Sequence, residues 1–413
     1  MASSLKRNML WNSAGSLIYL MSQWLITVLV TRLFGYADAG VLSLAMSISA
    51  TFQTISLFGI RNFQVSDIRD KYSDSTYVML RNITCTAALI FCMGFAFINR
   101  YSVRQILAIL FFMLFRLSEN YSDVLHGIAQ KNGRLDVAGK GFAIKGVLIF
   151  AAFIGSYFLG ASLTLAIAAM AAAAWLTTIL FDALFARKIR PFGFTDSFGK
   201  AFSLGKETYS LCIYLFLSAT MLLIPKYFLE MLTDEATLGA YASISAPSLI
   251  ISAVAGYIFS PFIDMFAKLY ESRDNKRFLL LALKIAGAIA LFGLCSIILA
   301  YFLGDFALKI IFGESILEFS YMLIPTLIAT ILSSLAAFLY MLSIVVRDFK
   351  NLLISCFGGC LAAALSSPLM INALGANGTS FAMIIGAAFS TLYLAVTVSV
   401  LIKKNKKEGD MNG

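Results

Sequence analysis

Five polar side chains recur along one stretch of this otherwise apolar chain, at spacings of three and four residues. They are Arg116, Glu119, Asp123, His126 and Gln130. At about 100° per residue, these positions fall within about an 80° arc of one helix face. The helix begins in the apolar run 106–115, so Arg116 is expected about half a bilayer deep. A charge there costs about 2.5–3.5 kcal/mol and normally faces a protein interior or a water-filled path. The face therefore predicts that something polar is handled within a membrane.

The two carboxylates of this face indicate a candidate site for a coupling ion. Glu119 and Asp123 are one helical turn apart and repel each other when both are ionised. Either one of them holds a proton near neutral pH, or the pair shares Arg116 or a bound cation. The competing interpretation is a static ion pair of Arg116 with Glu119 that only neutralises itself. His126, the single histidine, is a weaker candidate for a proton relay.

Polar side chains on other apolar stretches are candidates for contacting a substrate. Asn12 and Gln23 share one face of the first stretch, within about an 80° arc. Arg61 ends a face of hydroxyl groups in the second stretch, and Lys226 follows a proline in the seventh. The alternative is that such faces only join helices through hydrogen bonds. The candidate substrate-binding residues are Asn12, Gln23, Arg61, Arg116 and Lys226, and the candidate ion-coupling residues are Glu119 and Asp123.

Composition places these residues in a membrane protein. The chain of 413 residues is 60% hydrophobic and only 13% charged. About twelve apolar stretches are long enough to cross a hydrocarbon core. They cover residues 9–31, 39–60, 78–99, 105–129, 141–158, 162–186, 207–229, 237–266, 279–303, 320–346, 351–371 and 379–402. Because backbone groups must be satisfied within each span, the expected fold is an all-α polytopic bundle.

The distribution of basic residues predicts a topology. The chain has 32 Lys and Arg against 22 Asp and Glu, a net charge of +10. If the N-terminus is cytoplasmic, the segments on that side hold most of the basic residues, Lys145 among them. The outer segments hold only Arg32, Arg100, Arg104, Lys226 and Lys309. This bias predicts that both termini are cytoplasmic. The basic loops then face an anionic inner leaflet, and the charge requires no nucleic-acid partner.

The longest basic loop, 187–206, divides the apolar stretches into two equal sets. Weak sequence similarity between the two sets, at an offset of about 200 residues, favours an internal repeat about an axis along the membrane normal. The expected parts are a six-helix lobe over residues 1–190, a cytoplasmic inter-lobe loop over 191–206 and a six-helix lobe over 207–402. A cytoplasmic basic tail over 403–413 is expected to follow.

Three blocks of the chain resemble a family of polytopic flippases. They are FRLSENYSDVLHGIAQKNGRLDVAGK (115–140), LFGYADAGVLSLAMSISATFQTISLFGIRNFQVSDI (33–68) and IPKYFLEMLTDEATLGAYASISAP (224–247). The family is the Wzx-like O-antigen and capsular polysaccharide repeat-unit flippases, within the multidrug/oligosaccharidyl-lipid/polysaccharide superfamily. The resemblance implies two six-helix lobes around a central cavity that opens to one side of the membrane at a time. It also implies that the first, second, seventh and eighth spans border this cavity.

The resemblance also implies a function. The chain would move undecaprenyl-pyrophosphate-linked oligosaccharides from the inner to the outer leaflet of a bacterial cytoplasmic membrane, for O-antigen or capsule synthesis. Fixed cations would replace part of the hydration of the pyrophosphate. The expected partners are this lipid-linked oligosaccharide and membrane lipids, with a proton or sodium ion and a polysaccharide polymerase as further candidates.

Two alternatives stay open. A small-molecule or drug exporter of the same fold has the same helical plan. A membrane enzyme, such as a polysaccharide polymerase or a glycosyltransferase, typically carries a large external loop, whereas the external loops expected here are short. The sequence contains no phosphate-cradling loop, zinc-protease motif or nucleophile elbow, so no enzyme, metal or cofactor is expected.

Overall fold

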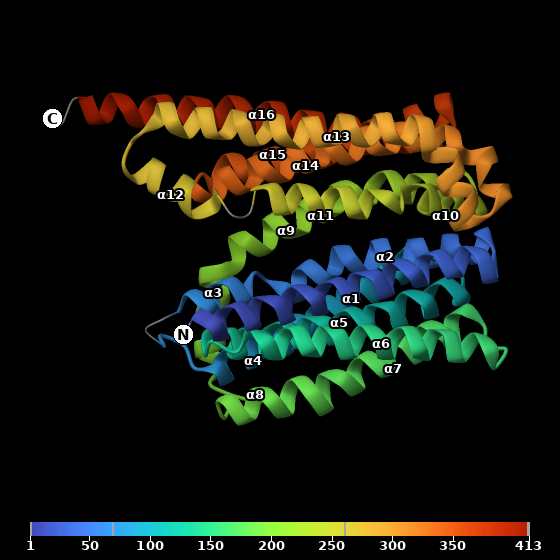
Figure 1. Ribbon diagram of the computed structural model, residues 1–413, viewed down its shortest axis with the longest axis horizontal. Coiled ribbons are helices and arrows are strands. Elements are labelled where there is room, and N and C mark those ends of the chain that lie inside the picture. The colour runs from blue at the N-terminus through green and yellow to red at the C-terminus, as the bar shows by residue number, and fades with distance from the viewer. Residues whose placement is uncertain (1, 68–69, 260–261, 411–413) are drawn as a thin grey trace. The chain divides into compact units, whose positions relative to one another are not determined.

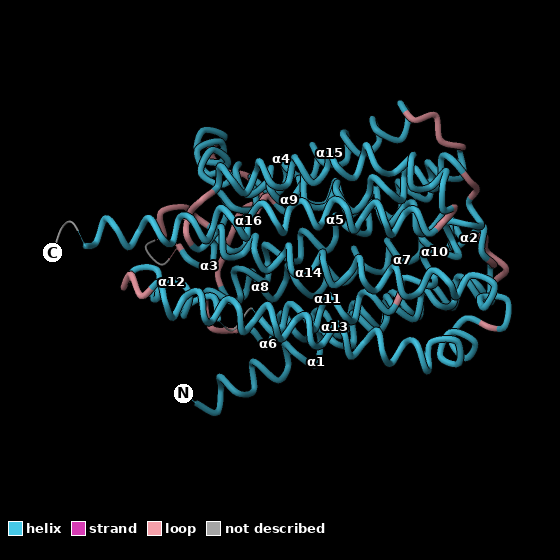
Figure 2. The backbone as a smooth tube through the Cα atoms, turned by 90° about the horizontal axis from the view of Figure 1, so that it is seen from above, coloured by secondary structure: helices cyan, strands magenta, loops and turns pink. Residues whose placement is uncertain are grey.

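The computed structural model of this chain describes residues 2–67, 70–259 and 262–410. Within these ranges the regular elements are helices, joined mostly by short loops (Figure 2). The first half contains α1 (Ala2–Phe34), α2 (Tyr36–Leu57), α3 (Ile60–Ser66), α4 (Asp74–Ile98), α5 (Val103–Lys131), α6 (Leu135–Phe158), α7 (Leu163–Thr177), the π-helix η1 (Thr178–Ala183) and α8 (Leu184–Ile189).

The second half is built in the same way. It contains α9 (Phe198–Leu232), α10 (Glu235–Ser245), α11 (Pro247–Phe259), α12 (Ile263–Glu271), α13 (Asn275–Phe312), the 3-10 helix η3 (Glu314–Met322), α14 (Leu323–Val345), α15 (Phe349–Leu374) and α16 (Asn377–Asp410). Helix α16 therefore continues through most of the predicted basic tail, whose last residues, 411–413, lie outside the described ranges.

Helix lengths and apolarity confirm the predicted all-α, polytopic class. Among the described residues, 10 helices are long and apolar enough to cross a membrane, or up to 11 if α10 and α11 form one span. Helix α5 has 29 residues and is also long enough to cross a membrane, but its polar and charged residues make it too polar to be among these 10 helices. The chain is therefore a multi-pass membrane protein. The predicted orientation, with both termini cytoplasmic, stays a prediction.

One expected span is broken. The stretch 237–266 contains α10 and α11, whose axes differ by 44°. Pro247 is the first residue of α11. Proline has no N–H to donate and its ring clashes with the preceding turn, so the helix is interrupted there.

The chain forms two compact units, residues 1–219 and 220–413. Helix α9 contains the division between them and begins at Phe198, inside the segment 191–206 that the sequence assigns to a loop. The part of that segment without helix holds Pro191 and Gly193, whereas the start of α9 contains the good helix formers Lys200, Ala201 and Leu204. The lobe boundaries expected from the sequence stay a prediction.

Helix α5 is the central helix of the first unit. It packs against α2, α4, α6 and α7 and is contacted by α3, α8 and η1. A capping box starts it, in which the Ser102 hydroxyl accepts from the Gln105 N–H and the Gln105 side chain accepts from the Ser102 N–H. Helix α1 packs along α6 (Figure 1). In the second unit, α16 packs against both α14 and α15, and α13 packs against α14.

Candidate functional site

The carboxylate of Glu119 is the centre of one polar network, here called the Glu119 cluster. Arg116 donates from Nη1 to Glu119 Oε2 over 2.7 Å, one turn along α5. From α1, the Tyr19 hydroxyl donates to Glu119 Oε1, and the Gln23 side-chain amide donates to that same oxygen over 3.2 Å. Gln53 of α2 donates to Glu119 Oε2 over 3.4 Å. Helices α1, α2 and α5 therefore meet around one carboxylate.

Arg116 is held by aromatic rings as well as by Glu119. Its guanidinium carbon lies 5.2 Å from the ring centre of Phe112 and 5.6 Å from that of Phe115. The side chain is only 15% exposed, and its Nε has no hydrogen-bond partner among the described residues. This cation therefore retains hydrogen-bonding capacity within the bundle.

Asp123 is the centre of a second network, the Asp123 cluster. Arg61 donates to Asp123 Oδ1 over 3.2 Å and to Gln130 over 3.0 Å. Arg81 of α4 donates to Asp123 Oδ2 over 2.9 Å, and its side chain is 0% exposed. Arg81 also donates to the backbone carbonyl of Ser56. Two guanidinium groups thus face one carboxylate.

The structure separates the two acids of the predicted polar face. Glu119 contacts Arg116, whereas Asp123 contacts Arg61 and Arg81, so the acids do not share Arg116. Each carboxylate has its own cationic partner, which compensates its charge within the bundle. Their proposed role in ion coupling stays a prediction.

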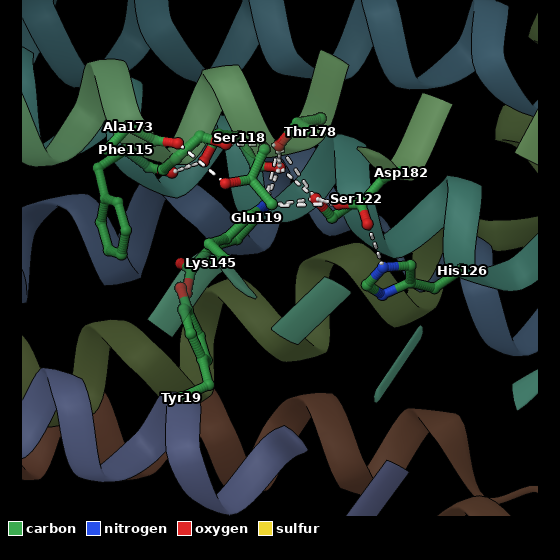
Figure 3. A network of polar contacts seen from close by, with 12 residues as sticks. Tyr19, Phe115, Ser118, Glu119, Ser122, His126, Lys145, Ala173, Thr178 and Asp182 are labelled. Atoms are coloured by element: carbon green, nitrogen blue, oxygen red, sulfur yellow. Dashed lines mark hydrogen bonds and ion pairs between the residues drawn. The ribbon is translucent and has the colours of Figure 1, made fainter. Parts of the chain in front are cut away.

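A third network, the Lys145 cluster, joins α5 to α6 and η1. Its members are Ser118, Ser122, His126, Lys145, Thr178 and Asp182, and all of them are buried. Figure 3 shows His126 directed at Asp182, with Ser122 beside the same carboxylate and Thr178 in contact with Ser122. Gly141 permits this approach, since a Cβ there would lie 2.3 Å from Asp182 Oδ1. His126 therefore belongs to a different network from Glu119 and Asp123.

The structure brings together only some of the predicted substrate-binding residues. Gln23, Arg61 and Arg116 contact the two acids of α5. Asn12 lies where α1 crosses α6, and its half-buried side chain has no hydrogen-bond partner in the described part of the chain. Lys226 lies half-buried on α9, in the second unit.

Sequence reasoning missed several members of these networks, among them Gln53, Arg81, Lys145 and Asp182. Arg81 and Asp182 are charged residues inside apolar stretches, and that signal alone could have singled them out. Lys145 was assigned to a basic loop. This was wrong, because α6 begins at Leu135 and buries the Lys145 side chain nearly three turns along the helix.

A separate group of charges ties loops together at one end of the first unit. Arg190 donates to Asp70 from Nη1 and Nη2 over 3.1 and 3.2 Å, and Lys131 donates to Asp70 over 2.6 Å. The hydrogen bonds from Arg190 and Lys131 lower the pKa of the Asp70 carboxyl to about 2. This group connects the α3–α4 loop to the ends of α5 and α8.

The fold is that of multi-pass membrane transporters and flippases, as comparison with solved structures shows. The chain is similar to the lipid II flippase MurJ in an inward closed conformation, with a TM-score of 0.74 and 13% identity, over 94% of this chain and 87% of that chain. It is also similar to an inward-facing multidrug resistance MATE family transporter of the MOP superfamily, with a TM-score of 0.62 and 13% identity, over 96% of each chain. A third similar structure is the MATE transporter VcmN of Vibrio cholerae in the bent form, with a TM-score of 0.61, 13% identity and 98% of each chain covered.

Sequence comparison points to a more particular relative. The capsular polysaccharide biosynthesis protein CapF of Staphylococcus aureus is 26% identical over 312 residues, which are 75% of this chain and 77% of CapF. No family model matches the chain. The structural neighbours are transporters and flippases rather than enzymes.

Proposed function

We propose that the chain is a flippase for polyprenyl-pyrophosphate-linked oligosaccharide repeat units. It moves them from the inner to the outer leaflet of a bacterial cytoplasmic membrane by alternating access, for the assembly of a surface polysaccharide. The fold shared with MurJ supports a flippase, and the relative named as a capsular polysaccharide biosynthesis protein supports this substrate class.

The single observation that carries the proposal is the position of Arg116. It places a guanidinium group beside two aromatic rings, midway along α5, with an Nε that has no described partner. An arriving pyrophosphate replaces Glu119 as the partner of Arg116, because a guanidinium binds phosphate oxygens by paired, charge-assisted hydrogen bonds. The Gln23 and Gln53 amides beside it provide donors and acceptors for sugar hydroxyls.

The physics of the substrate suits such a protein. A polyprenyl tail can remain in lipid while the protein carries only the charged, sugar-bearing head across the hydrocarbon core. Each network cation then offsets part of the hydration that the head loses. The protein has no chemical bond to make or break.

A small-molecule exporter is the second candidate, favoured by the similarity to MATE transporters over nearly the whole chain. The two candidates differ in the charge of the cargo. A flippase needs cationic groups for an anionic head, whereas an exporter of cationic drugs needs unpaired acids. Asp123 faces two guanidinium groups, so its cluster carries a net positive charge, which supports an anionic cargo.

Reconstitution into liposomes tests the proposal. The purified chain is placed in vesicles that contain a fluorescent polyprenyl-pyrophosphate oligosaccharide, and exposure of the head in each leaflet is followed with an impermeant reagent. We expect flipping of this lipid and no uptake of a cationic dye. Dye uptake without lipid flipping would establish the exporter instead. A fluorescent phosphatidylcholine in the same vesicles is the control for non-specific scrambling.

A further inference from the structure

The Lys145 cluster has no part in the proposed function, yet it is a built site. The ammonium of Lys145 is surrounded by oxygen atoms. It donates to Thr178 Oγ1 over 2.9 Å, to the Ser118 carbonyl over 3.4 Å and to the Ser122 hydroxyl. Asp182 Oδ2 lies 3.8 Å from it, and Ser122 donates to that same oxygen over 2.6 Å. The shell thus consists of one carbonyl, two hydroxyls and one carboxylate.

These are the ligand types that bind hard cations in proteins. A lysine ammonium has three donors and no acceptor, and it carries the charge of one monovalent ion. We propose that the shell is a monovalent-cation site of the first unit and that the Lys145 ammonium is its built-in occupant. A free sodium or potassium ion therefore has no place to bind there, and the first unit needs none at this position.

Burial and charge balance support a permanent occupant. The side chains of Lys145 and Asp182 are 1% and 0% exposed, so neither charge is compensated by water. His126 donates from Nε2 to the other carboxylate oxygen, Asp182 Oδ1, over 3.0 Å. The next acid toward Lys145, Glu119, is already paired with Arg116. Lys145 is thus the fixed cation that faces the buried carboxylate of Asp182.

Local backbone geometry is adapted to the site. Thr178 and Asp182 lie four residues apart on η1, a π-helical turn, and such single turns within α-helices are frequent at functional sites. On α6, a Cβ at Gly141 would lie 3.0 Å from His126 Nε2 as well as against Asp182. The helices therefore close around the cluster at a glycine and a π-turn.

Thermal unfolding of the full chain in detergent tests the proposal. The wild type, Lys145→Ala and Lys145→Met are compared in chlorides of sodium, potassium, n-propylammonium and N-methylglucamine at equal ionic strength. We expect the wild type to gain no stabilisation from sodium or potassium that Asp182→Asn abolishes. Lys145→Ala should melt lower in N-methylglucamine and recover saturably, by several degrees, in at least one of the small cations, because deletion opens the site. Lys145→Met fills the space and should not recover.

Two results would overturn the proposal. In one, the wild type is itself stabilised saturably by sodium or potassium, and Asp182→Asn removes the effect. In the other, Lys145→Ala responds to the cations no more than Lys145→Met. If Lys145→Ala is lost on purification, the folded yield in each salt is compared in the same way, and equal yields overturn the proposal.

A double variant provides a second measurement. Lys145→Met with Asp182→Asn removes both charges and should melt higher than Lys145→Met alone, because no carboxylate remains uncompensated. Equal melting of the double and single variants would mean that the ammonium does not balance Asp182. The experiment uses no transported substrate, so its outcome is independent of that of the proposed function.

Discussion

Arg116 is the residue on which substrate recognition rests in this proposal. Replacing it with alanine should lower the flipping rate by about tenfold to a hundredfold, because the charge-assisted hydrogen bonds to pyrophosphate, about 1.5–3 kcal/mol, are lost. Arg116→Lys should recover part of the rate, since lysine keeps the charge and loses the paired donors. The flipping assay measures both variants at matched amounts of reconstituted protein.

Arg104 provides the matched control for Arg116. It stands near the start of the same helix, is 46% exposed and pairs with Asp38. Arg104→Ala should flip lipid at the wild-type rate. Equal rates in Arg116→Ala and Arg104→Ala would remove Arg116 from substrate binding.

The two acids of α5 are the candidates for ion coupling. We expect Glu119→Gln or Asp123→Asn to change how flipping responds to imposed pH or sodium gradients. Carboxylates in a low-dielectric environment within a membrane protein commonly bind the coupling proton or ion. Asp123→Asn should also be the less stable variant, since it removes the charge partner of fully buried Arg81. Gradient-driven flipping in proteoliposomes measures the first effect and thermal unfolding the second. An unchanged gradient response in both variants would make the acids purely structural.

At the level of elements, glycines decide how closely α1 and α6 pack. A Cβ added at Gly139 would lie 2.1 Å from the backbone carbonyl oxygen of Trp11, and one at Gly155 on the same helix would meet nothing within 4 Å. We expect Gly139→Ala to lower the free energy of unfolding by about 1–3 kcal/mol, because backbone atoms cannot move aside as a flexible side chain can. Gly155→Ala should be neutral or stabilising by up to about 1 kcal/mol. Melting curves of the two variants, side by side, provide the test, and an equal loss in both would contradict the packing argument.

The α3–α4 loop is fastened by a carboxylate that titrates at low pH. The pKa of Asp70 is lowered to about 2 by Arg190 and Lys131, against about 3.9 in an unfolded chain. A lowered pKa contributes stability that is present above about pH 4 and is lost as the pH falls through about 2. Asp70→Asn should therefore melt at a lower temperature than the wild type at pH 7. The difference should be small because the carboxylate is exposed, and the two proteins should melt at nearly the same temperature near pH 2.

The Asp70 substitution leaves the backbone undisturbed. Asp70 has a φ of 51°, in the left-handed region that asparagine also tolerates. A difference between Asp70→Asn and the wild type that persisted unchanged down to pH 2 would show that the loss does not come from this charge. Melting temperatures at several pH values supply the comparison.

At the scale of the whole molecule, the charge bias across the spans predicts orientation. A reporter enzyme that is active only in the cytoplasm should be active when fused to the C-terminus, because basic loops resist translocation. A reporter that is active only outside should be silent there. The reverse pattern at the C-terminus would refute the predicted topology.

Only part of the candidate site could be predicted from the sequence. A charged residue within an apolar span has few places to go in a bilayer, so Arg116, Glu119 and Asp123 could be identified without a structure. Helical periodicity places them on one face. It cannot say which neighbouring helix meets which part of that face, and so it could not assign Arg81 to Asp123 or separate His126 from the others.

The class of this protein follows from its sequence alone, because a bilayer admits few backbone structures and apolar length reports each span directly. The excess of Lys and Arg in alternate loops likewise predicts an orientation in the membrane. The tertiary structure decided the rest: the partner of each acid and the burial of Lys145. Contacts between Arg61 and Asp123, or Lys145 and Asp182, join residues far apart in the chain, and only packing brings such residues together. Local sequence patterns do not predict such contacts.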